Sequence, residues 1–138
     1  MNGRKRRVQA GVTLIEMLVV VTIIALFITL VGPRIFKQAG KAQVVAAQAQ
    51  ISNFKVALGL YKLATGLYPP TEPGLAALRV KPQNVNQWDG PYLEKDVPPD
   101  PWGRPYQYKF PGDHGDEPDI VSLGPDGLPS ADDVVSWK

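Results

Sequence analysis

The apolar positions of the chain follow two different patterns, one after the other. From Val12 to Val31 the sequence is apolar almost without interruption, and Glu16 is the only ionisable residue in this run. A helix of about 20 residues, with a rise of about 1.5 Å each, is roughly 30 Å long, which matches the hydrocarbon core of a bilayer. The pattern therefore predicts a hydrophobic helix over residues 12–33 that can span a membrane.

Beyond this segment the helical period continues, but only one face remains apolar. Apolar side chains recur at spacings of three and four residues, at Val44, Ala47, Ile51, Phe54, Leu58 and Tyr61. Lysines lie off this stripe, so the pattern is that of an amphipathic helix that continues the apolar one. Gly32 and Pro33 should kink or locally melt the helix, which we expect to end near Thr65. From Ile51 to Tyr61 the stripe most simply packs on the chain's own globular part, while the apolar segment before Arg34 is available to contact other copies.

After Gly66 the composition changes to prolines and turn residues. We expect one short helix over residues 74–80 and short antiparallel strands over residues 106–110 and 119–123. Four aromatic residues should form a small core rather than a ligand-stacking platform: Trp88, Trp102, Tyr106 and Tyr108. The predicted fold class is α+β, with a long amino-terminal helix packed by its second half against a small sheet, and with a Pro/Gly-rich carboxyl-terminal loop.

The charges give the predicted span an orientation. Four consecutive basic residues, Arg4 to Arg7, precede the apolar run. By the positive-inside rule they hold the start of the chain in the cytoplasm, so residues after Arg34 should lie outside it. The chain carries a formal charge of +2, and without those four residues it would carry about −2. Nucleic acid is therefore not an expected partner, and the absence of cysteine means that no disulfide holds the exported part together.

The junction between leader and apolar run resembles the class III signal of type IV pilins and pseudopilins. The residues that carry the resemblance are Gly11 followed by Val12-Thr13-Leu14-Ile15-Glu16. The resemblance implies that a prepilin peptidase removes residues 1–11 after Gly11 and methylates the new amino terminus at Val12. The family usually has Phe at that position, so Val12 is a departure from its pattern.

Three further segments resemble the major pseudopilin family of type II secretion systems: residues 68–78, 100–108 and 122–127. Together with the leader they occur in the family's order and cover most of the chain. The resemblance implies a structural subunit of a periplasmic filament, with residues 34–138 forming its periplasmic domain. It also implies partners: further copies of the chain, minor pseudopilins, the prepilin peptidase, the inner-membrane assembly platform and its ATPase.

Glu16 needs a partner for a reason that does not depend on the family. An unpaired acid inside a bilayer costs roughly 2.5 to 3.5 kcal/mol at the centre of a spanning helix. Cleavage would create a cationic amino group at the buried end of each helix, and Glu16 could neutralise this group on a neighbouring copy during assembly. The simpler alternative is a signal anchor that tolerates one acid near its end.

The carboxyl-terminal region predicts a bound cation. It holds seven of the 13 carboxylates, and no Lys or Arg lies between Lys109 and Lys138. Glycines and prolines around these acids allow a stiff loop with converging oxygens, which suits Ca²⁺, although the spacing is not that of an EF-hand. The family resemblance implies that the ligands are the side chains of Asp126, Asp132 and Asp133 and the carbonyls of Leu123, Leu128 and Ser130. The alternative is a solvated acidic tail.

The sequence favours a protein that is not an enzyme. The one histidine, His114, lies among turn residues, and no serine has the neighbours that hydrolases require. Two other functions remain open, namely a type IV pilin of a surface pilus and a membrane-anchored calcium-dependent periplasmic hydrolase. The leading prediction is a single-pass protein of the bacterial inner membrane that polymerises into a periplasmic filament for protein secretion.

Overall fold

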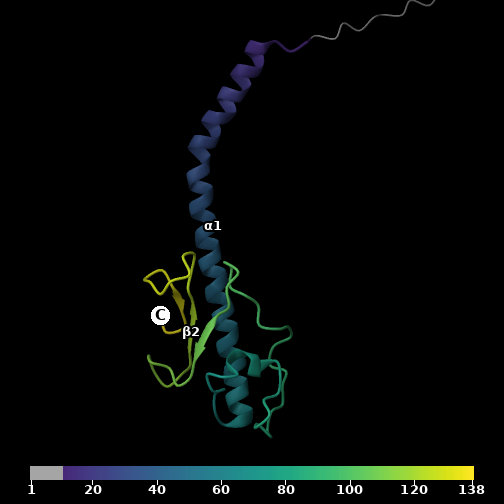
Figure 1. Ribbon diagram of the computed structural model, residues 1–138, viewed down its shortest axis with the longest axis vertical. Coiled ribbons are helices and arrows are strands. Elements are labelled where there is room, and N and C mark those ends of the chain that lie inside the picture. Colours follow the sequence, from purple (N-terminus) through teal and green to yellow (C-terminus); the bar gives the residue numbers. More distant parts are fainter. Residues whose placement is uncertain (1–10) are drawn as a thin grey trace, which may run out of the picture. The chain divides into compact units, whose positions relative to one another are not determined.

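The computed structural model describes residues 11–138, so the predicted leader lies outside the described residues except for Gly11 (Figure 1). The chain divides into two compact units, Met1–Ala39 and Gly40–Lys138. Its elements, in order, are the helix α1 (Leu14–Thr65), the 3₁₀ helix η1 (Gly74–Leu78), and the strands β1 (Gln107–Lys109), β2 (Asp119–Ser122) and β3 (Val134–Val135). The predicted fold class, a long helix with a small antiparallel sheet, is confirmed.

Helix α1 begins where the sequence supplies a cap. The Thr13 hydroxyl oxygen accepts a hydrogen bond from the Glu16 backbone N–H at 3.3 Å, and the Thr13 carbonyl accepts one from Met17 at 3.2 Å. Threonine followed three residues later by glutamate is the sequence pattern of a capping box. The same Glu16 that sequence analysis assigned to assembly therefore also lies in the first turn of the helix, where an anion is favoured.

Pro33 lies inside α1, which continues without interruption to Thr65. Of the two outcomes that the sequence left open at Gly32 and Pro33, a kink or local melting, the helix does not melt locally. Proline removes one hydrogen bond of the ladder, while the turns before and after it retain theirs. The predicted kink stays a prediction.

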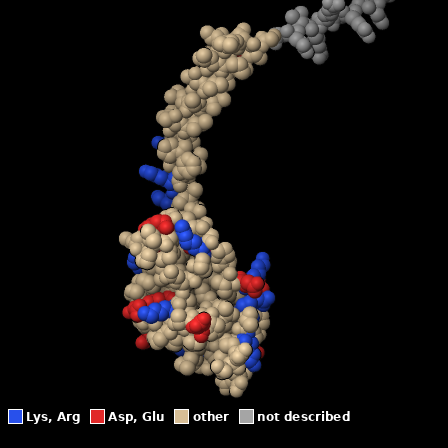
Figure 2. All heavy atoms as spheres, in the orientation of Figure 1, with Lys and Arg blue, Asp and Glu red and all other residues tan. Residues whose placement is uncertain are grey.

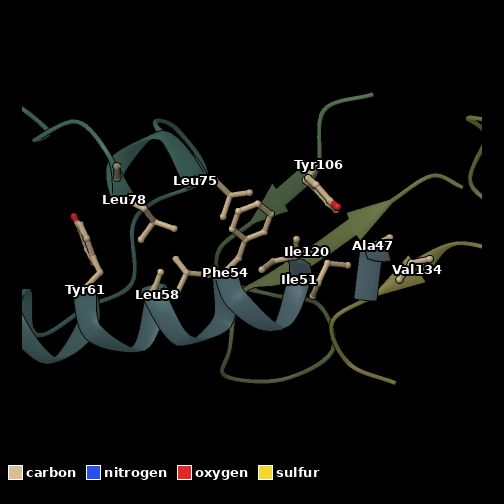
Figure 3. Packing of buried hydrophobic residues seen from close by; sticks show 12 residues of the cluster. Ala47, Ile51, Phe54, Leu58, Tyr61, Leu75, Leu78, Tyr106, Ile120 and Val134 are labelled. Atoms are coloured by element: carbon tan, nitrogen blue, oxygen red, sulfur yellow. The ribbon is translucent and has the colours of Figure 1, made fainter. Parts of the chain in front are cut away.

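The unit Gly40–Lys138 has its own core, and the predicted stripe supplies one side of it (Figure 3). Figure 3 shows side chains of α1 pointing toward η1 and the strands, with Phe54 between Leu75 and Tyr106. The rings of Phe54 and Tyr106 meet edge to face at 5.1 Å between centroids. The members of the stripe from Ile51 to Tyr61, which were expected to pack on the globular part, are all buried, and Ala47 and Ala57 are buried in addition, whereas Val44 is 38% exposed.

The sheet has the order β1-β2-β3, and both pairings are antiparallel. Strands β1 and β2 lie within the predicted ranges, whereas the two-residue β3 was not predicted. β3 pairs through Val121 with Val135 and through Ser122 with Val134, which connects the carboxyl-terminal segment to the core. The predicted aromatic core is confirmed, because Tyr106 is buried and the other three aromatic residues pack partly buried against the cluster.

Candidate functional site

Two regions carry the predicted functional residues, and the first is the amino-terminal part of α1. Every described residue from Gly11 to Val31 is exposed. One helix among the described residues is long and apolar enough to cross a bilayer: an 18-residue window of α1 has a mean hydropathy of 2.9, and none of it is buried. Figure 2 shows this part of α1 without charge on the visible face, whereas charged groups appear farther along the helix and on the unit Gly40–Lys138.

The two residues at the predicted cleavage site lie just before the helix. Gly11 and Val12 are exposed and precede its first turn. Glu16 is also exposed, and its carboxylate forms no ion pair with any residue that the structure describes. The geometry therefore leaves the predicted scissile bond and the predicted assembly residue accessible from outside the chain.

The second region is the acidic loop, which we define as residues 123–133, between β2 and β3. The Ser130 hydroxyl donates to Asp132 Oδ1 at 2.5 Å and lies 3.3 Å from Asp133 Oδ1. The Ser130 N–H donates to Asp133 Oδ2 at 3.2 Å. Three of the predicted ligand residues are thus brought together within one turn.

The other predicted ligands are not brought to the same point. Asp126 Oδ1 accepts a hydrogen bond from the Leu128 N–H at 3.1 Å, and the Leu123 carbonyl accepts one from Gly127 at 3.2 Å. No three acidic, histidine or cysteine side chains among residues 11–138 are clustered closely enough to hold a metal. The donor chemistry fits a hard cation only in part: two carboxylates and a hydroxyl converge, while Asp126 closes its own turn.

No lysine or arginine forms an ion pair with an acid of this loop within the described part of the chain. A basic side chain nevertheless reaches the loop from a distant segment. Arg104 donates from Nη1 to the Gly124 carbonyl at 2.5 Å and from Nη2 to the Pro125 carbonyl at 3.3 Å. Sequence analysis missed this residue, because it precedes the loop by about 20 positions and no local pattern connects the two.

A buried carboxylate holds the base of the loop, and it too was missed. Asp100 is 4% exposed. Its Oδ1 accepts the N–H groups of Trp102 at 3.1 Å and Arg104 at 2.8 Å, and its Oδ2 accepts the Ser122 hydroxyl at 2.6 Å. The signal that could have found it is an aspartate at the head of the Asp100-Pro101-Trp102-Gly103 turn, where its side chain bonds the backbone that follows. Gly103 has φ +85 and completes that turn.

His114 is exposed, as expected for a loop histidine, but it has specific contacts. Its Nδ1 lies 2.8 Å from Asp119 Oδ2, and its ring stacks on Trp137 with centroids 3.7 Å apart and an interplanar angle of 7°. Ser136 Oγ accepts the Ile120 N–H at 3.0 Å. These contacts fasten the carboxyl-terminal residues beside β2.

Burial perturbs the phenols of the core. Burial raises the pKa of Tyr108 above its ordinary value, and its hydroxyl donates to the Pro69 carbonyl at 2.7 Å. Burial, and then the charge of Asp100, raises the pKa of Tyr106. Phenols held neutral by burial are packing residues here, because each lies in or against the core cluster.

An uncovered apolar helix with one acid in its first turn, joined in sequence to a small helix-and-sheet unit, defines the class of pilin-like membrane-anchored subunits. Comparisons with known proteins agree. Residues 34–137 match the family described as "Type II secretion system (T2SS), protein G", and residues 6–32 match the prokaryotic N-terminal methylation motif. The chain belongs to the type II secretion system protein G family.

Individual relatives show the same relationship. The type II secretion system core protein G of Pseudomonas aeruginosa is 42% identical over 94% of this chain and 92% of its own length. That of Vibrio cholerae is 38% identical over 98% of this chain and 96% of its own. The crystal structure of the major pseudopilin from the type 2 secretion system of enterohaemorrhagic Escherichia coli matches with a TM-score of 0.63 and 38% identity, covering 74% of this chain and 92% of that one.

Proposed function

We propose that this chain is a structural subunit of the pseudopilus of a type II secretion system, and that it assembles with copies of itself. The observation that carries the proposal is the uncovered apolar surface of α1 in a member of the protein G family. An apolar surface of this extent is stable only in lipid or against other protein. Membrane anchoring before assembly and helix-to-helix packing after it provide both environments.

We further propose the orientation and processing of the chain. The basic residues at its start would hold residues 1–11 in the cytoplasm of the producing bacterium, with the apolar segment in the inner membrane and residues 34–138 in the periplasm. Cleavage after Gly11 would release the leader, and Val12 would become the methylated amino terminus. The match of residues 6–32 to the methylation motif supports this step. Mass spectrometry of the natural protein tests it, and a retained leader would overturn it.

In this proposal Glu16 accepts the amino group of a neighbouring copy and sets the axial register of the filament. Its exposure and its lack of an ion-pair partner among the described residues support the assignment. Glu16→Ala should abolish pelletable filaments and secretion, whereas Glu94→Ala, a change at another exposed glutamate, should not. Filaments and secretion at the original level in Glu16→Ala would contradict the role.

We also propose that the acidic loop binds Ca²⁺ through the side chains of Asp126, Asp132 and Asp133, with carbonyls of Leu123, Leu128 and Ser130. The convergence of Asp132, Asp133 and the Ser130 hydroxyl supports it. When bound, the cation would neutralise these acids and connect the two ends of the loop. Asp126 Oδ1 accepts the Leu128 N–H, and the second oxygen of that carboxylate would be the one to join.

Thermal unfolding of the full chain in detergent micelles tests the metal, with Ca²⁺ against chelator. A ligand that binds only the folded state at 100 times its Kd stabilises by about 2.7 kcal/mol. For the unit Gly40–Lys138, which is about 100 residues long, this corresponds to a rise in Tm of roughly 11 to 22 °C. An unchanged Tm would discard the calcium site. Mg²⁺ serves as the control, because its demand for octahedral geometry should make it a weaker ligand here.

The remaining partners follow from the secretion role: minor pseudopilins, the prepilin peptidase, and the inner-membrane platform with its ATPase. We propose a mechanical role with no catalysis by this chain, in keeping with a family of structural subunits. Capture of the platform or of minor pseudopilins with the full chain from membranes, lost when the apolar segment is deleted, tests this set.

A further inference from the structure

We propose that Arg104 is a positioning residue for the acidic loop, and that its guanidinium holds the first turn of the loop in the shape that presents the acids to a cation. This inference rests on the proposed calcium binding. Its physical basis is a two-pronged contact between a planar cation and two consecutive backbone carbonyls, those of Gly124 and Pro125. A guanidinium can make such a contact because its donors form a rigid fork.

The two carbonyls that Arg104 binds are not those predicted to bind the cation. Arg104 contacts Gly124 and Pro125, whereas the predicted backbone ligands are Leu123, Leu128 and Ser130. The arginine and the metal therefore do not compete for the same oxygens. Instead, the arginine satisfies the carbonyls that the turn leaves outside the ligand set.

Gly127 shows how closely the guanidinium fits into the turn. A Cβ atom at this position would lie 2.6 Å from Nε and 2.7 Å from Cζ of Arg104. Gly127 has φ +72, and its N–H donates to the Leu123 carbonyl at 3.2 Å, which closes the turn. Glycine therefore leaves room for the guanidinium beside the turn, and the positive φ disfavours any other residue at this position.

The backbone of Arg104 is itself fixed. Its N–H donates to Asp100 Oδ1 at 2.8 Å, and its carbonyl accepts the Asp100 N–H at 2.7 Å. Ser122, which ends β2 just before the loop, donates its hydroxyl to the other oxygen of the same carboxylate at 2.6 Å. The buried carboxylate of Asp100 therefore fixes both Arg104, which binds the loop carbonyls, and Ser122, which ends the strand before the loop.

This arrangement orders half of the loop before any cation binds. The segment from Leu123 to Gly127 is held by Arg104, whereas Ser130, Asp132 and Asp133 interact mainly with one another. Because ordering flexible backbone opposes binding, a loop that is partly ordered in advance binds its ligand more tightly. Removing the fork should therefore weaken calcium binding, even though the positive charge that is lost with it would repel a cation.

The test compares Arg104→Ala and Arg104→Lys with the original full chain in detergent micelles. Lysine keeps the charge but lacks the two-pronged geometry, so both variants should bind Ca²⁺ more weakly. The Kd for Ca²⁺, measured by calorimetry, should rise by about tenfold, which is the lower end of the effect of residues that orient metal ligands. The matched control is Arg79→Lys, because Arg79 is half-buried away from the acidic loop and its guanidinium pairs with Asp96 at 3.4 Å. It should leave the Kd unchanged.

A purely structural role for Arg104 would lower the Tm in chelator and leave the Kd unchanged, and this result would overturn the proposal. Tighter binding by Arg104→Ala, with Arg104→Lys equal to the original protein, would also overturn it, because charge alone would then matter. Amide exchange at Gly127 in chelator gives a readout independent of metal. Faster exchange in Arg104→Ala supports the ordering of the turn, and unchanged exchange refutes it. If the original chain binds no Ca²⁺, the calcium role fails, and amide exchange alone decides whether Arg104 orders the turn.

Discussion

Replacement of Asp100 by asparagine is the sharpest test of how the globular unit holds its loop. Asp100 is almost completely buried and accepts three hydrogen bonds, from two backbone N–H groups and from the Ser122 hydroxyl. Ser122 is itself fully buried. Asparagine keeps the size of the side chain but removes the charge and replaces one acceptor oxygen with a donor.

The magnitude follows from those three bonds. A hydrogen bond to a charged group contributes about 1.5 to 3 kcal/mol and a neutral one about 0.5 to 1.5. Two bonds therefore weaken by about 1 kcal/mol each, and the third, from Ser122, is lost or must be reversed, so Asp100→Asn should cost about 3 to 4 kcal/mol. For a unit of about 100 residues this lowers the Tm by roughly 12 to 30 °C.

The assay is thermal unfolding of the full chain in micelles, followed by near-ultraviolet circular dichroism of the aromatic core. Asp96→Asn is the matched control, because the Asp96 side chain is 94% exposed and its contact with Arg79 is 3.4 Å long; such surface pairs contribute little. Ser122→Ala, alone and combined with Asp100→Asn, measures the coupling between the two side chains. Equal Tm values for Asp100→Asn and Asp96→Asn would refute the assignment of Asp100 as the anchor of the loop.

Three further outcomes follow from the same structure. Phe54→Ala should lower the free energy of unfolding of the globular unit by about 3 to 5 kcal/mol in denaturant, because Phe54 is fully buried. Val56→Ala, at a position that is 67% exposed, should change the free energy of unfolding by less than about 1 kcal/mol. Similar losses in the two variants would contradict the packing. Tyr108 has a raised pKa, so its contribution to stability is complete below its ordinary value of 10.0 and is lost as the pH rises through its higher folded value; Tyr108→Phe should flatten this alkaline loss. The hydrogen bond and ion pair with Lys109 lower the pKa of Asp113. In Lys109→Met, a carboxyl titration followed by NMR should show a higher pKa for Asp113. An unchanged pKa would exclude the pair.

Local sequence patterns were enough to predict the long helix and its two chemical halves. The apolar run and the three-and-four spacing are properties of consecutive residues, and the stripe residues from Ile51 to Tyr61 that were expected to pack are buried. The helix continues through Pro33, as the helical period on both sides of that residue predicted. The first two strands were found because aromatic and β-branched residues cluster there.

The acidic loop was predicted only in part. Composition located the acids, and the structure brings Asp132 and Asp133 to the Ser130 hydroxyl. It keeps Asp126 on its own turn, so the joint action of all three acids stays a prediction. Arg104 could not be inferred from the sequence of the loop, because only the residues near the loop were considered as a source of positive charge and Arg104 lies about 20 positions before it.

By itself, the sequence determined which part of this protein is apolar enough for a membrane, where its long helix begins and ends, and where its acids concentrate. These properties depend on neighbours within a few turns of the chain. Only the tertiary structure decided that Asp100 meets Ser122, that Arg104 grips the carbonyls of the acidic loop, and that β3 completes the sheet. Such contacts join residues 12 to 22 positions apart, and their geometry is set by how the chain packs around its core rather than by any local preference.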